Sequence, residues 1–341
     1  MQPEQSPVPS QEPCISQLSG HSGAPLFSKH PGYKVDLEHD IFLDSTSDSH
    51  FVRYQGVEKN LYNKIYDNRN NIIGYDRYEK YAQLVKESEK PLEALAGQED
   101  VYWAVKEALE SITSENQSKS TVRILEIGSG LGYLTYSLNN EGYNAIGLDI
   151  SQSAVDAACK RFGDFYTCNA MEDVKEKFDV VISTEVIEHC ENPLAFMKDA
   201  KRLLASNGRI IITTANKSIY SPALLWHTDP PPVHLWWLSE PSFYYLAGKL
   251  DMKLELVDFY RFYHKNKRKL DFKPSKSTTF DENYNVDIRE NWVFRLTRMA
   301  IKIAPQTDYF FRRSFFIFQL WKKFLYDKNT KAYSVCGVFS L

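Results

Sequence analysis

Short apolar runs alternate with helix-like segments through the middle of the chain. Runs rich in Val, Ile and Leu are typical of strands that are buried on both faces of a parallel sheet, and helices between them complete βαβ units. The pattern therefore predicts an α/β fold with a doubly wound, Rossmann-like, mostly parallel seven-stranded sheet. The expected strands are 122–127, 143–150, 165–168, 178–183, 209–214, 253–263 and 332–341. The expected helices are 133–140, 152–162, 193–205 and 240–250, and Ser151 is the expected N-cap of the second.

The composition divides the chain into five segments. Ser, Pro, Gln and Gly dominate the first segment, which predicts a disordered leader. Two stretches with helical spacing, 75–89 and 99–112, then predict an N-terminal helical cap. A long interruption before the last strand predicts an insertion with helices at 287–303 and 308–326. The segments are the leader at 1–50, the cap at 51–118, the sheet domain at 119–262, the helical insertion (a lid or substrate region) at 263–331 and the final strand at 332–341.

Charge and cysteine usage exclude several classes of protein. A net charge of −3 with 25% charged residues gives no global sign of a polyanion-binding protein. The five cysteines are scattered and form no Cys-x-x-Cys pair, which argues against a zinc site or a disulfide framework and for a reducing, cytoplasmic setting. The N-terminal residues show no signal-peptide pattern, and no apolar run is long enough to span a membrane.

Three alternating glycines follow the first predicted strand and predict a cofactor-binding turn. Gly128, Gly130 and Gly132 let the backbone turn tightly beside the N-terminus of the next helix. A dinucleotide fingerprint requires its last glycine where Tyr133 stands, and no Gly-Lys-Ser/Thr of a P-loop follows. Glu126 instead places a carboxylate at the end of the strand, which suits a cationic ligand group and would repel a pyrophosphate.

Asp149 ends the second predicted strand, where a carboxylate can accept both hydroxyls of a ribose. Both dehydrogenases and methyltransferases have an acid there, so Asp149 alone does not discriminate between them. Glu126 and Tyr133 do discriminate. Four motifs also follow in order: LEIGSGLG at 125–132, IGLDIS at 146–151, FDVV with TEVIEH at 178–189, and LL with NGR and TTAN at 203–216. Together they resemble the class I S-adenosylmethionine-dependent methyltransferases, closest to the subgroup of ubiquinone-biosynthesis O-methyltransferases and related small-molecule or sugar methyltransferases. The resemblance covers about 121–250 and the final strand.

This resemblance implies S-adenosyl-L-methionine as the cofactor and assigns a role to each matching residue. The family often has Asp where this chain has Asn169, whose carbonyl oxygen can still accept from the adenine amino group. The implied contacts are Glu126 with the ammonium, Gly128, Ser129, Gly130, Leu131 and Gly132 with the methionine part, Asp149 with the ribose, Ile150, Asn169, Ala170 and Met171 with the adenine, and Thr184 and Glu185 below the sulfonium.

Methyl transfer from a sulfonium needs in-line positioning of the acceptor and a base only where the acceptor is a hydroxyl. His189 is the candidate base, because an imidazole titrates near neutral pH, and Glu188 and His234 are further candidate catalytic residues. The alternative is that Glu188 and His189 form the start of a turn and bond backbone groups. Likewise, His234, Trp236 and Trp237 either shape the acceptor pocket or pack on the sheet edge.

Glu185, Glu188 and His189 have the spacing i, i+3, i+4, so one helical turn would place them on a common face. With His234 they would offer oxygen and nitrogen ligands to a divalent cation. The small-RNA 2′-O-methyltransferases resemble this arrangement. Because the same string is common in members not known for metal use, no metal ligand is assigned.

The predicted activity is methyl transfer to an oxygen of a small-molecule or sugar-like acceptor. RNA 2′-O-methylation with metal assistance is the enzymatic alternative, and nucleic acid is disfavoured by the modest charge. A catalytically inactive cofactor-binding module is the other. The aromatic and basic segment 308–326 predicts a core-facing helix, with peripheral membrane contact or a lid as alternatives.

Overall fold

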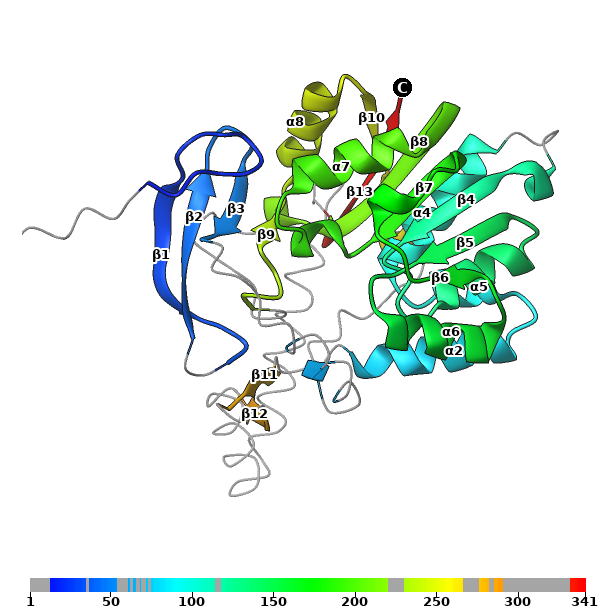
Figure 1. The fold of residues 1–341 in the computed structure, drawn as a ribbon, viewed down its shortest axis with the longest axis horizontal. Coiled ribbons are helices and arrows are strands. Elements are labelled where there is room, and N and C mark those ends of the chain that lie inside the picture. The colour runs from blue at the N-terminus through cyan, green and yellow to red at the C-terminus, as the bar shows by residue number, and fades with distance from the viewer. Residues whose placement is uncertain are drawn as a thin grey trace, which may run out of the picture.

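A seven-stranded sheet forms the centre of the computed structural model (Figure 1). Its strand order is β10-β13-β8-β7-β4-β5-β6, and all neighbours are parallel except β13, which is antiparallel to both β8 and β10. The predicted α/β sheet is thereby confirmed. Its strands are β4 (Arg123–Ile127), β5 (Asn144–Leu148), β6 (Tyr166–Thr167), β7 (Phe178–Thr184), β8 (Leu204–Ala215), β10 (Lys253–Leu256) and β13 (Ser334–Ser340). The structure describes residues 13–34, 37–53, 61, 64–65, 68, 72, 75–113, 118–219, 230–265, 276–281, 285–290 and 332–341.

Helices cover both faces of this sheet. One hydrophobic core joins α4, α5 and α6 to strand residues such as Ile124 and Val180, and a second joins α7 and α8 to their neighbours Leu125 and Val181. Successive strand residues therefore face opposite cores, as the two-residue period of a strand requires. The helices are α2 (Asp76–Glu87), α3 (Pro91–Ala96), α4 (Asp100–Ile112), α5 (Tyr133–Asn140), α6 (Gln152–Phe162), α7 (Pro193–Arg202) and α8 (Glu240–Leu250). Short 3₁₀ segments are η1 (Lys119–Thr121), η2 (Met171–Asp173), η3 (Ile187–His189) and η4 (Lys217–Ile219).

The predicted N-terminal helices exist, but they do not form a separate cap. Val101, Val105 and Leu109 on one face of α4 belong to the same core as the sheet, and α4 contacts β7, β8 and β13. An amphipathic helix is stable only when its apolar stripe is covered, and the sheet covers this one. The predicted division at 118/119 therefore does not separate two cores.

The prediction of a disordered leader at 1–50 is wrong for the residues that the structure describes. These residues form β1 (Ala24–Pro31), β2 (Glu38–Asp44) and β3 (Ser49–Val52), which continue into β9 (Trp236–Trp237) as a four-stranded sheet, here called the N-terminal sheet (Figure 1). Its stabilising partners lie almost 190 residues along the chain, so local composition gave no sign of it. Ile41, Phe42 and Phe51 are buried in it.

The insertion also differs from its prediction. The strand expected at 253–263 ends at Leu256, because the chain then turns into helix α9 (Tyr260–Lys265). Phe259, just before this helix, and Phe262 within it pack on Trp103 of α4. A hairpin, β11 (Lys276–Phe280) and β12 (Val286–Glu290), occupies the start of the helix expected at 287–303, which is wrong there. The rest of that helix and the segment 308–326 lie outside the described residues. Among the described helices, none is both long and apolar enough to cross a membrane.

Candidate active site

The predicted site residues gather where β4 and β7 lie side by side at the middle of the sheet. The chain leaves the carboxyl end of β4 toward the next helix on one face, whereas β7 leads to the other face. Such a switch point opens a crevice outside the strand ends, where ligands of doubly wound sheets bind. The loops that follow β4, β5 and β7 all begin at this edge, because the three strands are parallel.

The glycine turn after β4 has the backbone conformation that requires glycine. Gly128, Gly130 and Gly132 have φ values of +78°, +50° and +80°. A Cβ on Gly128 would lie 2.4 Å from Val186 Cγ2, and one on Gly132 would lie 2.6 Å from Tyr166 Cε1. A Cβ on Gly130 would meet no atom within 4 Å, so the middle of the turn faces open space.

Two further side chains of the turn have opposite positions. Leu131 packs in the hydrophobic core beside Leu134, so only its backbone can face a ligand. Ser129 is 5% exposed, and its buried hydroxyl has no hydrogen-bond partner among the described residues. Buried hydroxyls are normally satisfied, so Ser129 has capacity for a ligand atom.

Asp149 ties the glycine turn to the end of β5. Its Oδ2 accepts from the Gly130 amide at 2.8 Å, and its Oδ1 accepts from the Ser151 amide at 2.8 Å. Burial raises the pKa of this carboxyl above its ordinary value, against both hydrogen bonds. Each oxygen keeps a further lone pair, which suits acceptance from two vicinal hydroxyls.

Glu126 lies beneath the turn and is 3% exposed. The hydroxyl of Thr135, in the first turn of α5, donates to its Oε2. Burial raises the pKa of Glu126 to about 8, which the bond from Thr135 only partly offsets. A cationic group placed beside this carboxyl would favour its ionised form.

The far side of the site is more open. Ile150 is 89% exposed at the end of β5, an unusual exposure for an apolar side chain. The Asn169 amide donates to Thr167 Oγ1 at 2.8 Å, which leaves its carbonyl oxygen as an acceptor. Ala170 is exposed and Met171 half-buried at the start of η2.

Thr184 ends β7, and Glu185 follows it in the left-handed backbone region with φ +55°. The Glu185 amide donates to the Thr213 carbonyl at 3.1 Å, and burial raises the pKa of its carboxyl well above the ordinary value. Because η3 begins only at Ile187, Glu185 does not share a helical turn with Glu188, and the predicted common face is absent. Residues strained in this way concentrate at functional sites.

Glu188, His189 and His234 converge even so. Each offers a ligand atom, and these atoms all lie within 4.8 Å of one another. The rings of His189 and His234 have centroids 4.8 Å apart, and His189 Nδ1 is 2.8 Å from the Val233 carbonyl oxygen. A carbonyl can only accept, so Nδ1 carries the proton and the Nε2 of a neutral His189 has a free lone pair. His189 therefore bonds a backbone group, as the alternative interpretation expected, and it also lies beside Glu188 and His234.

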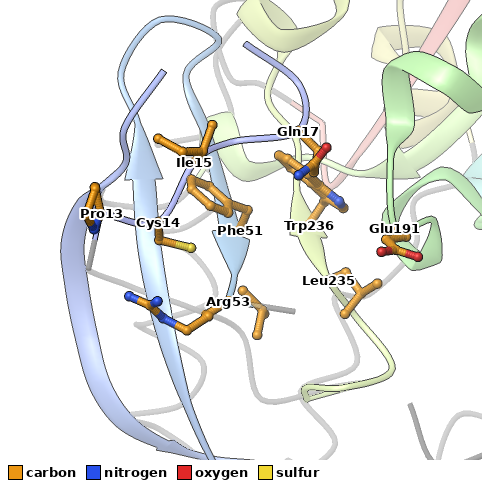
Figure 2. A pocket seen from close by; sticks show the side chains of 10 residues that line it. Pro13, Cys14, Ile15, Gln17, Phe51, Arg53, Glu191, Leu235 and Trp236 are labelled. Atoms are coloured by element: carbon orange, nitrogen blue, oxygen red, sulfur yellow. The ribbon is translucent and has the colours of Figure 1, made fainter. Parts of the chain in front are cut away.

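The neighbouring tryptophans pack in the core. Trp236 is 2% exposed and stacks on Phe51 at a centroid distance of 5.4 Å, and Trp237 is 1% exposed. A pocket opens beside them, at the seam between the N-terminal sheet and the loop after η3 (Figure 2). Its lining residues are Pro13, Cys14, Ile15, Gln17, Phe51, Val52, Arg53, Glu191, Leu235 and Trp236.

The sequence pattern does not indicate the contact between α2 and the site. Arg77 forms an ion pair of 2.7 Å with Glu99, and its charge is close enough to lower the pKa of Glu185 against burial. The hydroxyls of Tyr102 and Tyr133 are 2.6 Å apart and join α4 to the helix after the glycine turn. Only the clustering of tyrosines in these helices was visible, and a tyrosine-rich core explains it equally well.

The chain also matches known proteins. The family model described as a methyltransferase domain matches residues 74–256, more than half of the chain. The ubiquinone biosynthesis O-methyltransferase of Bradyrhizobium diazoefficiens is 36% identical over 111 residues, which are 30% of this chain and 44% of that protein. The protein of the same name from Rickettsia bellii is 32% identical over 117 residues, which cover 32% and 49% of the two chains. The chain thus spans about half the length of these curated relatives, or less.

Solved structures are similar to this chain at lower sequence identity. A methyltransferase from Thermotoga maritima, titled a possible histamine N-methyltransferase, has a TM-score of 0.41 at 14% identity and covers 82% of this chain and 99% of its own. The magnesium protoporphyrin IX methyltransferase of Synechocystis has a TM-score of 0.38 at 16% identity, with coverage of 69% and 97%. The fold, the ordered motifs and the family match identify the chain as a member of the class I S-adenosylmethionine-dependent methyltransferases.

Proposed function

We propose that this enzyme transfers the methyl group of S-adenosylmethionine to an oxygen of a small-molecule acceptor, with His189 as general base. The observation that carries the proposal is the convergence of Glu188, His189 and His234 beside the carboxyl end of β7. The names of the curated relatives, O-methyltransferases of ubiquinone biosynthesis, support an oxygen acceptor.

The cofactor supplies an activated methyl group, and the residues of the switch point fit its parts. Open space at Gly130 and the available Ser129 hydroxyl leave room for the methionine part, and Glu126 lies where an ammonium would be accepted. Asp149 offers its free lone pairs to the ribose, and the exposed face of Ile150 offers an apolar surface to the adenine.

The remaining predicted contacts stay proposals of the same kind. Asn169, Ala170 and Met171 would border the adenine next to Ile150, and Thr184 and Glu185 would close the site at the end of β7. The raised pKa of Glu185 means that burial favours its neutral form, which donates as well as accepts.

His189 has the geometry of a fixed base. The Val233 carbonyl holds the proton on Nδ1 and orients the ring, so Nε2 can accept a proton from an acceptor hydroxyl. Glu188 is 2% exposed, and its carboxylate lies within 4.8 Å of a His189 ring nitrogen. The ring of His234 lies next to that of His189, at 4.8 Å between centroids.

Turnover and binding measured together test this assignment. Wild type and His189→Gln would be incubated with radiolabelled S-adenosylmethionine and a panel of matched phenols, sugars and amines, with S-adenosylhomocysteine affinity measured by calorimetry. We expect label on hydroxyl acceptors, and a loss of roughly 10²- to 10⁴-fold in kcat for His189→Gln at unchanged affinity. Label on amines alone, or full activity of His189→Gln, would contradict the proposal.

The same cluster favours a second candidate, a divalent cation held by Glu188, His189 and His234. Metal-bound histidines commonly donate their other ring N–H to a backbone carbonyl, and His189 does so to Val233. Ligand atoms around one cation lie about 3 to 4 Å apart, so the observed 4.8 Å spread requires only a small contraction. Elemental analysis of the purified protein, with activity before and after chelation, tests it; no bound cation and no effect of the chelator would dismiss it.

A further inference from the structure

The loop that carries His234 is held between η3 and the N-terminal sheet. The Leu235 amide donates to the Glu188 carbonyl at 2.9 Å, and the Leu235 carbonyl accepts from the Val52 amide at 3.0 Å. β9 is two residues long and, within the described part of the chain, has β3 as its sheet partner. Backbone bonds from β3 therefore reach the residue next to His234.

Side-chain packing reinforces this pairing at Phe51. Its ring is 3% exposed and lies between Trp236, at 5.4 Å between centroids, and Phe42, at 5.7 Å. Gly23 supports the ring from behind, since a Cβ there would lie 2.6 Å from Phe51 Cζ. Figure 2 shows Phe51 and Trp236 next to each other at the seam, with Leu235 and Glu191 on the side of the methyltransferase core. Phe51 therefore packs β9 against the rest of the N-terminal sheet.

A buried polar seam fixes the same sheet at a second place. Lys217, 5% exposed, forms an ion pair of 2.8 Å with Asp48 in the β2–β3 turn. The hydroxyls of Ser239 and Ser242 donate to the backbone carbonyls of Asp48 and Ser47 at 2.7 and 2.8 Å. The N-terminal sheet is thus anchored to η4 and α8, and it cannot shift without breaking bonds to the core.

We propose that the N-terminal sheet is part of the transferase site and that Phe51 is a positioning residue, which holds His234 opposite Glu188 and His189. The proposal rests on the transferase site proposed above. The matched methyltransferase domain begins at residue 74, so the family match does not include residues 13–53.

Nuclear magnetic resonance of the full chain with labelled histidines tests the proposal. The rings of His189 and His234 are close enough for a nuclear Overhauser effect between them, and the two signals are assigned with His189→Gln and His234→Gln. We expect Phe51→Ala to weaken this effect several-fold, because it falls with the sixth power of distance. Phe51→Leu, which keeps an apolar side chain against Trp236, should retain most of it.

Two other variants serve as an independent perturbation and a control. Gly23→Ala pushes on the Phe51 ring from the opposite side and should also weaken the effect. Glu38→Ala truncates an exposed side chain on β2 of the same sheet, and should leave the effect unchanged. Should Phe51→Ala fail to fold, Gly23→Ala and Phe51→Leu still decide the question.

The result that overturns the proposal is a full-strength effect between His189 and His234 in every folded Phe51 and Gly23 variant. Calorimetry with S-adenosylhomocysteine separates this failure from failure of the proposed function. We expect affinity within about twofold of wild type for the Phe51 variants, because the glycine turn is built without the N-terminal sheet. A wild-type protein that binds no S-adenosylhomocysteine would refute the proposed cofactor contacts and leave the histidine measurement intact.

Discussion

Alanine at Gly128 and at Gly130 should give opposite results, because the two glycines of one turn have different surroundings. Both have positive φ, so each alanine carries about 1 to 2 kcal/mol of left-handed strain. The Gly128 methyl would also lie 2.4 Å from Val186 Cγ2, which adds about 1 to 3 kcal/mol of overpacking. We therefore expect Gly128→Ala to lose about 2 to 5 kcal/mol of unfolding free energy, and Gly130→Ala only the strain.

Ligand affinity should show the reverse order. The Gly130 methyl would enter the open space that we assign to the cofactor, so Gly130→Ala should weaken S-adenosylhomocysteine binding at least about tenfold, or 1.4 kcal/mol. Urea unfolding measures the stability of both variants, and calorimetry measures their affinity. Val186→Ala in the Gly128→Ala background should recover the overpacking part, which a double-mutant cycle isolates.

Either of two results would refute this reasoning. Equal stability losses at Gly128 and Gly130 would show that the contact with Val186 costs nothing. Undiminished affinity in Gly130→Ala would show that the open side of the turn is not where the cofactor lies.

Three further predictions concern charged groups around the site. Burial raises the pKa of Glu126 from 4.5 to about 8, so between these pH values the folded state retains a proton that the unfolded state has lost. The free energy of unfolding should therefore fall as the pH rises from 4.5 to about 8. Urea titrations should show this decline in the wild type and not in Glu126→Gln. Asp149→Ala removes the acceptor of the Gly130 amide and of the proposed ribose contacts, and calorimetry should show S-adenosylhomocysteine affinity lower by roughly 10- to 100-fold; unchanged affinity would remove Asp149 from the site. Asp48→Ala leaves the buried Lys217 ammonium without its ion-pair partner and should lower the free energy of unfolding in urea by about 3 to 5 kcal/mol. Lys217→Met leaves a half-exposed carboxylate without its partner and should cost less. The reverse order would contradict a stabilising role of this ion pair.

The sequence predicted the parts of the molecule that depend on local chemistry. Dense Val and Ile in β7 predicted a buried strand, and Ser151 was predicted to cap α6, where its side chain accepts from the Ala154 amide. The glycines at 128–132 predicted a turn, and all three of its glycines have positive φ. These features are determined by residues within one turn or one strand of each other.

Features that depend on distant partners were missed. Local composition predicts a leader where the N-terminal sheet lies, because β3 finds its stabilising neighbour in the distant β9. Local spacing predicts a strand near Phe259, although this side chain packs on Trp103. The contact of Arg77 with the site was missed for the same reason. No periodicity within a short window contains information about a partner more than 100 residues away.

The two halves of the proposed site therefore differ in what fixes them. The cofactor half is built from successive βα units, and the bond between Gly130 and Asp149 spans only 19 residues. The acceptor half is built where η3 meets the loop of His234, and that loop is in turn bonded to Val52 of the N-terminal sheet. Because these contacts do not pass through the glycine turn, changes in the N-terminal sheet can reposition His234 without altering cofactor binding. A separation of this kind lets one cofactor site serve different acceptors, and it explains why the sequence indicates the cofactor so much more clearly than the acceptor.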